Sequence, residues 1–139
     1  MDRNSAAQPA LVELTPYECW QLLEQPVGIA RVVWTHEGAA AIVLVNYTVA
    51  DGALWFQTSP DSRLARECQD GQILVEIDSV DVATRSGWSV IVTGSAENVG
   101  ADDVPDILGE LQVWPSGHRP LFLRVSADQV TGRRLLPHR

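Results

Sequence analysis

Apolar and polar residues alternate with a period of two along most of this chain, which is the pattern of half-buried β-strands. Asp51 and Gly52 predict a hairpin turn, because an Asp-Gly pair readily takes the positive φ angles that a two-residue turn needs. Six strands in hairpin order predict a small antiparallel barrel, in which closure of the sheet removes its edges. The expected strands are Val27–Thr35, Ala39–Val49, Ala53–Thr58, Ile73–Asp78, Gly87–Glu97 and Leu121–Val125.

One of these strands, Ala39–Val49, is almost continuously apolar. Such a strand is expected to be buried on both faces. It carries more apolar residues than one face of a small barrel can cover, so we expect part of it to lie in a symmetric subunit interface. The chain is therefore expected to form a homodimer.

Three short helices are expected around the barrel. The capping box Thr15-Pro16-Tyr17-Glu18 has proline at the first helical position and predicts a helix from Pro16 to Glu24. A second helix is expected over Ser62–Cys68. A third is expected over Asp102–Glu110, where an acidic first turn suits the helix dipole.

Length and composition describe one domain over residues 11–136, preceded by a flexible polar arm over residues 1–10. All 10 basic residues are arginine, and the formal net charge is -8. The absence of lysine excludes Schiff-base chemistry on a lysine, and the acidic balance argues against nucleic acid as a partner. No metal ligand set is expected, since the three histidines are isolated from one another and from any cysteine.

The cysteines and the lack of long apolar runs indicate a cellular compartment. Cys19 and Cys68 lie far apart in the sequence and form no Cys-x-x-Cys pair, which fits a reducing environment. The N-terminal residues lack the apolar core of a signal peptide, and no apolar run approaches the length of a membrane span. We therefore expect a cytoplasmic protein without a membrane partner.

The segment Leu54-Trp-Phe-Gln-Thr-Ser-Pro-Asp-Ser-Arg-Leu-Ala65 carries the clearest candidate chemistry. Thr58, Ser59 and Ser62 can donate hydroxyl hydrogen bonds, and the first turn of the following helix offers backbone N–H groups. Arg63 adds a fork of donors that suits a phosphate. The segment thus predicts a cradle for a small phosphorylated ligand. The alternative is an ordinary strand–turn–helix in which Ser59 or Asp61 caps the helix.

In their order and spacing, several segments together resemble the pyridoxamine 5′-phosphate oxidase-like family of flavin-binding split β-barrels, in its short, single-domain actinobacterial form. The resemblance covers roughly residues 12–134. It is carried by Leu14-Thr-Pro-Tyr-Glu-Cys-Trp-Gln-Leu-Leu23, Val27-Gly-Ile-Ala-Arg-Val32, Val45-Asn-Tyr47, Asp51-Gly52, Phe56-Gln-Thr-Ser-Pro-Asp-Ser-Arg-Leu-Ala65, Val75-Glu-Ile-Asp78, Thr84-Arg-Ser-Gly-Trp-Ser-Val90 and Val130-Thr-Gly-Arg-Arg134.

The resemblance implies a mainly β fold, a six-stranded antiparallel split β-barrel with short peripheral helices. It also implies a homodimer with two flavin sites at the subunit interface. The phosphate of FMN is expected on the cradle formed by Thr58, Ser59, Ser62 and Arg63. The isoalloxazine ring is expected against the backbone of Val45, Asn46 and Tyr47, with Gly87, Trp88 and Ser89 of the same or the partner chain nearby. Strand backbone offers the donors and acceptors that the ring's pyrimidine edge needs.

Two of these side chains have a second interpretation. Trp88 can be an aromatic residue of the barrel core, and Tyr47 a half-buried strand tyrosine. Two positions also depart from the family pattern, since Leu64 replaces a second basic residue and Asp61 places a negative charge beside the expected phosphate.

Three functions follow from the resemblance. The first is an FMN-dependent oxidoreductase acting on an unidentified small molecule, and the second is a reductase that uses a deazaflavin coenzyme. The third is a non-catalytic protein that binds flavin or haem, which the two departures favour. No pair of a nucleophile and a base suggests catalytic residues, which is compatible with hydride transfer by a cofactor.

Overall fold

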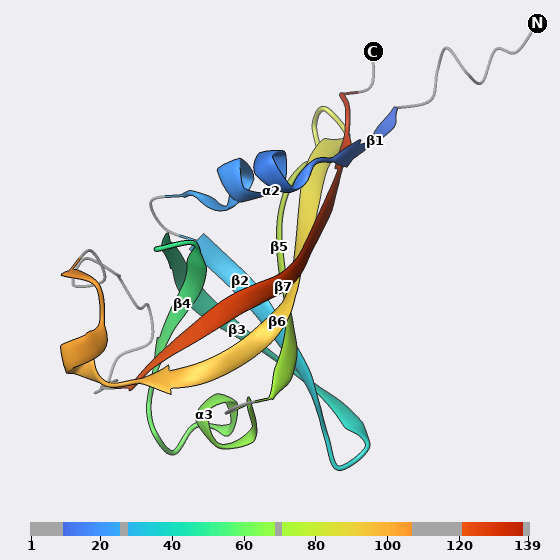
Figure 1. Cartoon of the computed structure of the whole chain (residues 1–139). Coiled ribbons are helices and arrows are strands. Elements are labelled where there is room, and N and C mark those ends of the chain that lie inside the picture. Colours follow the sequence, from blue (N-terminus) through green and yellow to red (C-terminus); the bar gives the residue numbers. More distant parts are fainter. Residues whose placement is uncertain (1–9, 26–27, 69–70, 107–120, 138–139) are drawn as a thin grey trace, which may run out of the picture.

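Seven antiparallel strands form a single sheet that closes into a ring (Figure 1). The structure, a computed structural model, describes residues 10–25, 28–68, 71–106 and 121–137. The strands are β1 (Leu11–Leu14), β2 (Gly28–His36), β3 (Ala39–Ala50), β4 (Ala53–Thr58), β5 (Gln72–Asp81), β6 (Ser86–Val99) and β7 (Leu121–Leu135). The helices are α2 (Pro16–Leu23), α3 (Arg63–Cys68) and the short 3-10 helix η1 (Ala101–Asp103).

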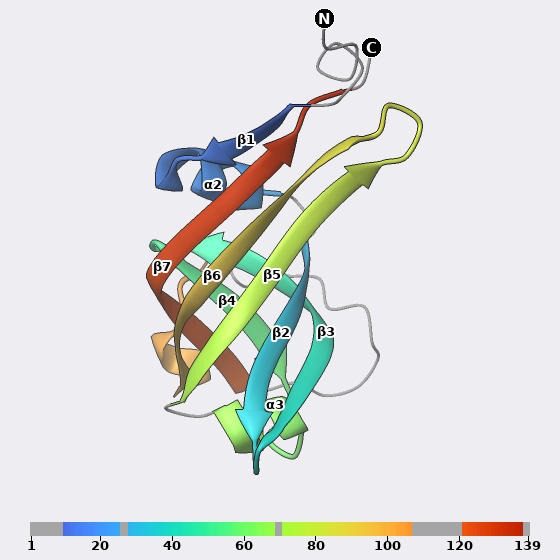
Figure 2. The same cartoon turned by 90° about the vertical axis from the view of Figure 1, so that its right-hand side faces the viewer.

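The order of the strands is β1-β7-β4-β3-β2-β5-β6, and β6 pairs back onto β7. Six strands therefore make the closed ring, and β1 is added to the outer edge of β7. This confirms the predicted mainly β, six-stranded antiparallel barrel. Figure 2 shows β5 and β6 continuing beyond the ring as a long hairpin, with α3 at the opposite end of the molecule.

Two places in the ring lack continuous pairing. Strand β4 pairs with residues 121–125 of β7, and β1 pairs with residues 132–135, so the stretch of β7 between them lies beside neither strand. Strand β3 pairs with β4 only over Tyr47–Ala50, so Val45 lies beyond the end of that ladder. These two interruptions position the sites described below.

The interior is filled by alternate residues of the strands. The largest fully buried side chains are Tyr47, Phe56, Leu23, Leu54, Ile77, Leu123, Val32, Val75, Val90, Val92 and Val125. The prediction that β3 is buried on both faces is wrong for the single chain. Its outward-pointing Ile42 and Leu44 are 64% and 62% exposed, because nothing in the described chain covers that face.

The predicted capping box is confirmed at the start of α2. The Thr15 backbone N–H donates to Glu18 Oε1 at 2.9 Å, and the Glu18 N–H donates to Thr15 Oγ1 at 3.2 Å. The predicted third helix is wrong in its described part, where a 3-10 turn over Ala101–Asp103 forms in place of an α-helix and Val104 is already extended. Proline at the next position disfavours helical geometry at Val104. Residues 107–110 of that prediction lie outside the described residues.

Two further elements differ from the sequence-based expectation. The first strand, β1, occupies Leu11–Leu14 at the start of the predicted domain, and residues 1–9 of the predicted arm lie outside the described residues. The apolar pattern alone ended the last strand at Val125, whereas β7 continues to Leu135 and includes Val130–Arg134, a segment that carries the family resemblance. In the part of the chain that the structure describes, no helix has the length and apolar character needed to cross a membrane.

Candidate functional site

The predicted phosphate cradle lies where β4 ends and α3 begins. Thr58 Oγ1 donates to Ser62 Oγ at 2.9 Å, and the Ala65 backbone N–H donates to the same Ser62 oxygen at 3.1 Å. Ser62 is thus the residue that caps α3, whereas Ser59 accepts a bond from the Asp61 N–H at 3.4 Å. Because Ser62 Oγ accepts both bonds, its own hydroxyl proton remains able to donate to a ligand.

Arg63 is held by a neighbour that the sequence interpretation did not include. Its Nε and Nη2 donate to the two carboxylate oxygens of Glu67, each at 3.1 Å. Its guanidinium also lies over the Trp34 ring, 5.8 Å from the ring centroid. The Arg63 side chain is nevertheless 61% exposed, so its remaining N–H groups face solvent. The arginine is therefore fixed in place while still able to bind an anion.

Glu67 is the centre of this network. Besides Arg63, the indole Nε1 of Trp34 donates to Glu67 Oε1 at 2.9 Å, and His36 Nδ1 lies 3.8 Å from the same oxygen. Hydrogen bonds from Arg63 and Trp34 lower the pKa of Glu67 to about 2. The i,i+4 spacing of Arg63 and Glu67 was a sequence signal for the pair, because such residues are neighbours on a helix.

Acid should therefore weaken the fold through Glu67. Its folded-state pKa lies below the ordinary value of 4.5, so the stabilisation is complete above about pH 5 and is lost as the pH falls toward about 2. We expect Glu67→Gln, which keeps an acceptor but has no charge, to lose less stability between pH 7 and pH 3 than the parent does. Urea unfolding at the two pH values measures this. The matched control is Glu37→Gln at an exposed turn, and equal pH dependence in parent and Glu67→Gln would contradict the expectation.

Other residues around the cradle are less favourable for an anion. Leu64 is 3% exposed and packs in the core, so this position faces away from the cradle mouth. Asp61 is exposed, next to the cap. Arg66 is also exposed, and its Nε donates to the Ser62 carbonyl at 3.4 Å. Arg63 and Arg66 are thus the cations that α3 offers at this site.

The β3 residues predicted to contact a flavin ring present backbone rather than side chains. Tyr47 is 1% exposed, its hydroxyl donates to the Leu23 carbonyl at 2.9 Å, and burial raises its pKa to about 12. Its ring packs directly over Gly28, where any Cβ would overlap it. Asn46 is buried and donates to the Gly28 carbonyl at 3.4 Å, and Val45 packs against the core. Ring stacking on Tyr47 is therefore excluded by its burial.

The third predicted group lies far from the α3 end of the molecule in one chain. Gly87 and Ser89 pair with Val80 and Asp78 beside the β5–β6 hairpin, and Figure 2 shows this hairpin at the opposite end from α3. Ser95 pairs with Gln72 at the α3 end of β6. Trp88 lies seven residues from Ser95 along the same strand, which corresponds to about 23 Å. Trp88 itself is half-buried and packs against the main core. Its core interpretation is the one that the single chain supports.

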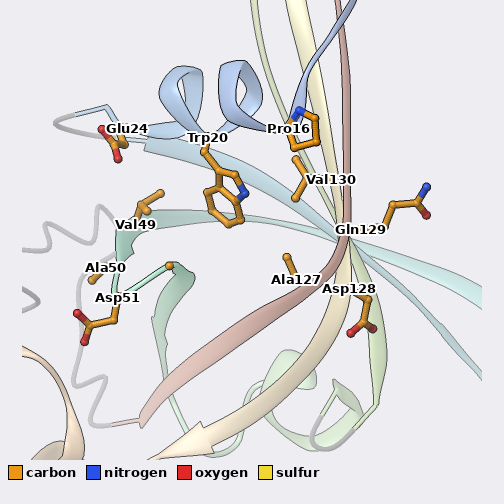
Figure 3. Close-up of a pocket in the computed structure, with 11 residues that line it drawn as sticks. Pro16, Trp20, Glu24, Val49, Ala50, Asp51, Ala127, Asp128, Gln129 and Val130 are labelled. Atoms are coloured by element: carbon orange, nitrogen blue, oxygen red, sulfur yellow. The ribbon is translucent and has the colours of Figure 1, made fainter.

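A second concave feature, which the sequence interpretation did not identify, lies in the gap along β7. Helix α2 covers it, and Figure 3 shows Trp20 pointing from α2 into the space between β3 and β7. The cavity has a volume of about 740 Å³. Among the residues of this and the other described parts of the chain, no group of three His, Cys, Asp or Glu side chains is placed to hold a metal ion.

Comparison with known proteins agrees with this architecture. Residues 15–134 match the model of the family described as pyridoxamine 5′-phosphate oxidase. The uncharacterized protein Rv0080 of Mycobacterium tuberculosis is 32% identical over 142 residues, which cover 96% of this chain and 93% of that protein.

Two solved structures share the fold at comparable identity. The FAD binding protein from Mycobacterium smegmatis is 30% identical with a TM-score of 0.71, over 91% of this chain and 99% of that one. A structure from Corynebacterium glutamicum, provisionally named a pyridoxamine 5′-phosphate oxidase, is 27% identical with a TM-score of 0.73, over 93% and 96% of the two chains. The similarity therefore extends over nearly the whole barrel and not over a local motif.

Proposed function

Because this chain belongs to the pyridoxamine 5′-phosphate oxidase family, we propose that it is a homodimeric FMN-dependent oxidoreductase acting on a small molecule. The observation that carries the proposal is the prearranged group at the start of α3. There the hydroxyls of Thr58 and Ser62 are hydrogen-bonded, the guanidinium of the next residue, Arg63, is held by Glu67, and Thr58 ends the strand that pairs with β3.

The residues present fit a flavin phosphate and ring. Thr58 donates its hydroxyl proton to Ser62, which leaves the Ser62 hydroxyl proton to donate to a phosphate. The exposed N–H groups of Arg63 supply charge-assisted bonds. Continuing the β3–β4 register beyond Tyr47 and Phe56 brings Val45 opposite Thr58, which places ladder-end backbone beside the cradle. When bound, the flavin supplies the hydride chemistry, and the protein orients it.

FAD is a second candidate, and one comparison favours it. The Mycobacterium smegmatis protein, 30% identical over 91% of this chain, is named an FAD binding protein. FMN and FAD share the ring and the first phosphate, so the same cradle suits both. A deazaflavin coenzyme and a non-catalytic flavin- or haem-binding role are the other functions that the sequence leaves open.

The dimer is proposed from the exposed outer face of β2, β3 and β5. Ile29, Ile42 and Leu44 are 40%, 64% and 62% exposed on this face. Arg31 lies between the apolar positions and pairs with Glu76 at 3.1 Å and Asp78 at 3.0 Å. An apolar face whose arginine is paired within the same chain suits burial against a second copy. Because the β6 residues lie far from the cradle, a flavin that contacts both groups would draw them from two chains.

Disrupting this face should release monomers. We expect the parent to be a dimer at micromolar concentration, with an interface above roughly 2,000 Å² in total. Leu44→Asp adds a third carboxylate beside Arg31, which already pairs with Glu76 and Asp78, and should shift the mass measured by light scattering to that of a monomer. Tyr17→Asp, at a 72% exposed position on α2, is the matched control and should leave the mass unchanged. A parent that is already monomeric at that concentration would contradict the proposal.

The absorption spectrum of the purified protein tests the cofactor. A band at ~450 nm indicates a flavin, and a band at ~400–420 nm indicates a deazaflavin or haem. The absence of a band indicates that the protein was purified without a cofactor. Fluorescence titration of the cofactor-free protein with FMN, FAD and riboflavin then gives the affinity for each of the three ligands. Saturable FMN binding that is tighter than riboflavin binding supports the cradle. Equal affinity for riboflavin and FMN, or no binding of either, would overturn it.

A further inference from the structure

Arg63 uses only one edge of its guanidinium in the pair with Glu67. Its Nε and Nη2 donate to Glu67 Oε2 and Oε1, each at 3.1 Å, and these two nitrogens form the side edge of the planar group. The end edge consists of Nη1 and the second N–H of Nη2, which belong to the same rigid fork of donors. No described residue accepts a hydrogen bond from that edge, and the side chain is 61% exposed. A second anion can therefore bind Arg63 while its pair with Glu67 stays intact.

Glu67 is itself held from the wall of the barrel. The indole N–H of Trp34, on β2, donates to Glu67 Oε1 at 2.9 Å. Trp34 is 5% exposed and belongs to the main core, and the Glu67 side chain is only 12% exposed. The carboxylate is therefore fixed by the sheet and has little freedom to follow a moving arginine.

The same tryptophan also contacts the arginine directly. The Arg63 guanidinium lies over the Trp34 ring, 5.8 Å from the ring centroid. One buried residue thus restricts Arg63 twice, through Glu67 and through its ring. A long surface side chain otherwise loses rotamer freedom when it binds a ligand, and restriction before binding lowers that cost.

We propose that Glu67 is a positioning residue for the flavin phosphate, which occupies the side edge of Arg63 and so presents the end edge to the phosphate. This role rests on the proposed function, because the phosphate is that of the proposed flavin. The opposite role for Glu67 is competition, in which the phosphate has to displace the carboxylate from Arg63. The two roles predict changes of opposite sign, which a double-mutant cycle measures.

The cycle uses the parent, Arg63→Ala, Glu67→Gln and the double variant, each titrated with FMN and riboflavin by fluorescence. The measured quantity is the phosphate preference, which is the Kd for riboflavin divided by the Kd for FMN. Because riboflavin lacks the phosphate, a change in the fold or in ring binding alters both Kd values and cancels in this ratio. Direct repulsion between Glu67 and the phosphate is the same with and without Arg63, so it cancels in the cycle.

Arg63 should contribute less to the phosphate preference once Glu67 is replaced. In the parent, Arg63→Ala should lower the preference roughly ten- to a hundredfold. In the Glu67→Gln background, the same replacement should lower it by no more than about threefold. The reason is that glutamine places an amide NH2 against one of the N–H donors that the carboxylate accepts, so Arg63 is no longer held along its side edge.

Glu37→Gln is the matched control. It removes the same charge from an exposed carboxylate that, like Glu67, lies 3.8 Å from a ring nitrogen of His36, but that makes no bond to Arg63. In this background Arg63→Ala should keep its full effect on the phosphate preference.

Trp34→Phe tests the anchor by a second route. It keeps an aromatic ring beside the guanidinium and removes only the indole N–H that holds Glu67. In this background Arg63→Ala should have an effect about two- to fivefold smaller than in the parent. Thermal melting of each variant checks that it is folded.

An effect of Arg63→Ala in the Glu67→Gln background that equals or exceeds its effect in the parent overturns the positioning role. A larger effect would assign Glu67 to competition. In either case, a parent that prefers FMN to riboflavin still supports the flavin site. A parent that binds FMN no more tightly than riboflavin overturns the proposed function and the positioning role together, so the two failures are distinguishable.

Discussion

Replacing Arg63 by alanine is expected to weaken FMN binding roughly ten- to a hundredfold, while riboflavin binds the variant and the parent about equally. The reason is that, in the proposed site, this guanidinium supplies charge-assisted hydrogen bonds to the phosphate. Glu67 and the Trp34 ring hold the side chain, and its free N–H groups remain in solvent. Without it, a phosphate dianion would depend on hydroxyl groups beside the negative charge of Asp61. Fluorescence titration of FMN and riboflavin against both proteins measures the difference.

Two further variants complete this test. Asp61→Gly removes a like charge from the cradle and should tighten FMN without changing riboflavin. Arg66→Ala removes the same charge as Arg63→Ala one turn further along α3, and should have a smaller effect because its Nε is directed at the Ser62 carbonyl. If Arg63→Ala leaves the FMN affinity unchanged, the cradle interpretation is wrong and Arg63 serves only its pair with Glu67.

Replacing Gly94 by alanine is expected to cost about 3 kcal/mol of folding stability, or roughly 10 °C in Tm. Gly94 lies at the register shift where β6 and β7 pair, and a Cβ there would overlap the carbonyl oxygen of Ser126. This atom belongs to the backbone of the neighbouring strand, so no side-chain rotation can relieve the contact. The ladder that closes the barrel would have to move instead.

Gly100 provides the matched control for this substitution. A Cβ at Gly100 would have no atom within 4 Å, and its φ of -71° is accessible to alanine. Gly100→Ala should therefore change stability by no more than about 0.5 kcal/mol, with the sign favouring the variant. Thermal unfolding of both variants decides the matter. Equal Tm values for the two would show that the β6–β7 ladder accommodates a methyl group at its bulge.

Local signals in the sequence predicted most of the ring. Two of these signals, the Asp51-Gly52 turn and the capping box at Thr15, depend on interactions between residues close in sequence. A third, the alternating pattern of Ile73–Asp78, marks one clearly buried face of a strand. The structure contains each of them. The closure of the barrel was predicted from the number and hairpin order of the strands, and the family resemblance implied the same fold.

The missed elements share a physical cause. Strand β1 has only four residues, and its partners in β7 lie about 120 residues away, so no local signal could reveal the pairing. The second half of β7 carries Ser126, Asp128 and Gln129, polar residues that suit a strand edge beside an open gap but interrupt the apolar pattern. A strand with little buried surface on that side has little hydrophobic periodicity to detect.

The strand–turn–helix at the candidate site was predicted from the sequence, but the contacts of its side chains were not. Thr58 and Ser62 are hydrogen-bonded where β4 ends and α3 begins, whereas Arg63 pairs with Glu67. The roles of Glu67 and Trp34 depended on contacts between α3 and β2, across 33 residues of sequence. The cavity under α2 depended on where two ladders end, which only the three-dimensional register reveals.

The pairing of the first strand with the last has a consequence for biosynthesis. Strands β2 to β5 can pair with one another as they leave the ribosome, because their partners are near in sequence. Strand β7, in contrast, supplies the edge for β1, β4 and β6 at once. Until residues 121–135 have been synthesised, β1 has no partner and the ring stays open, with the apolar face of β4 uncovered. The nascent chain would therefore expose an aggregation-prone strand edge until its closing segment emerges.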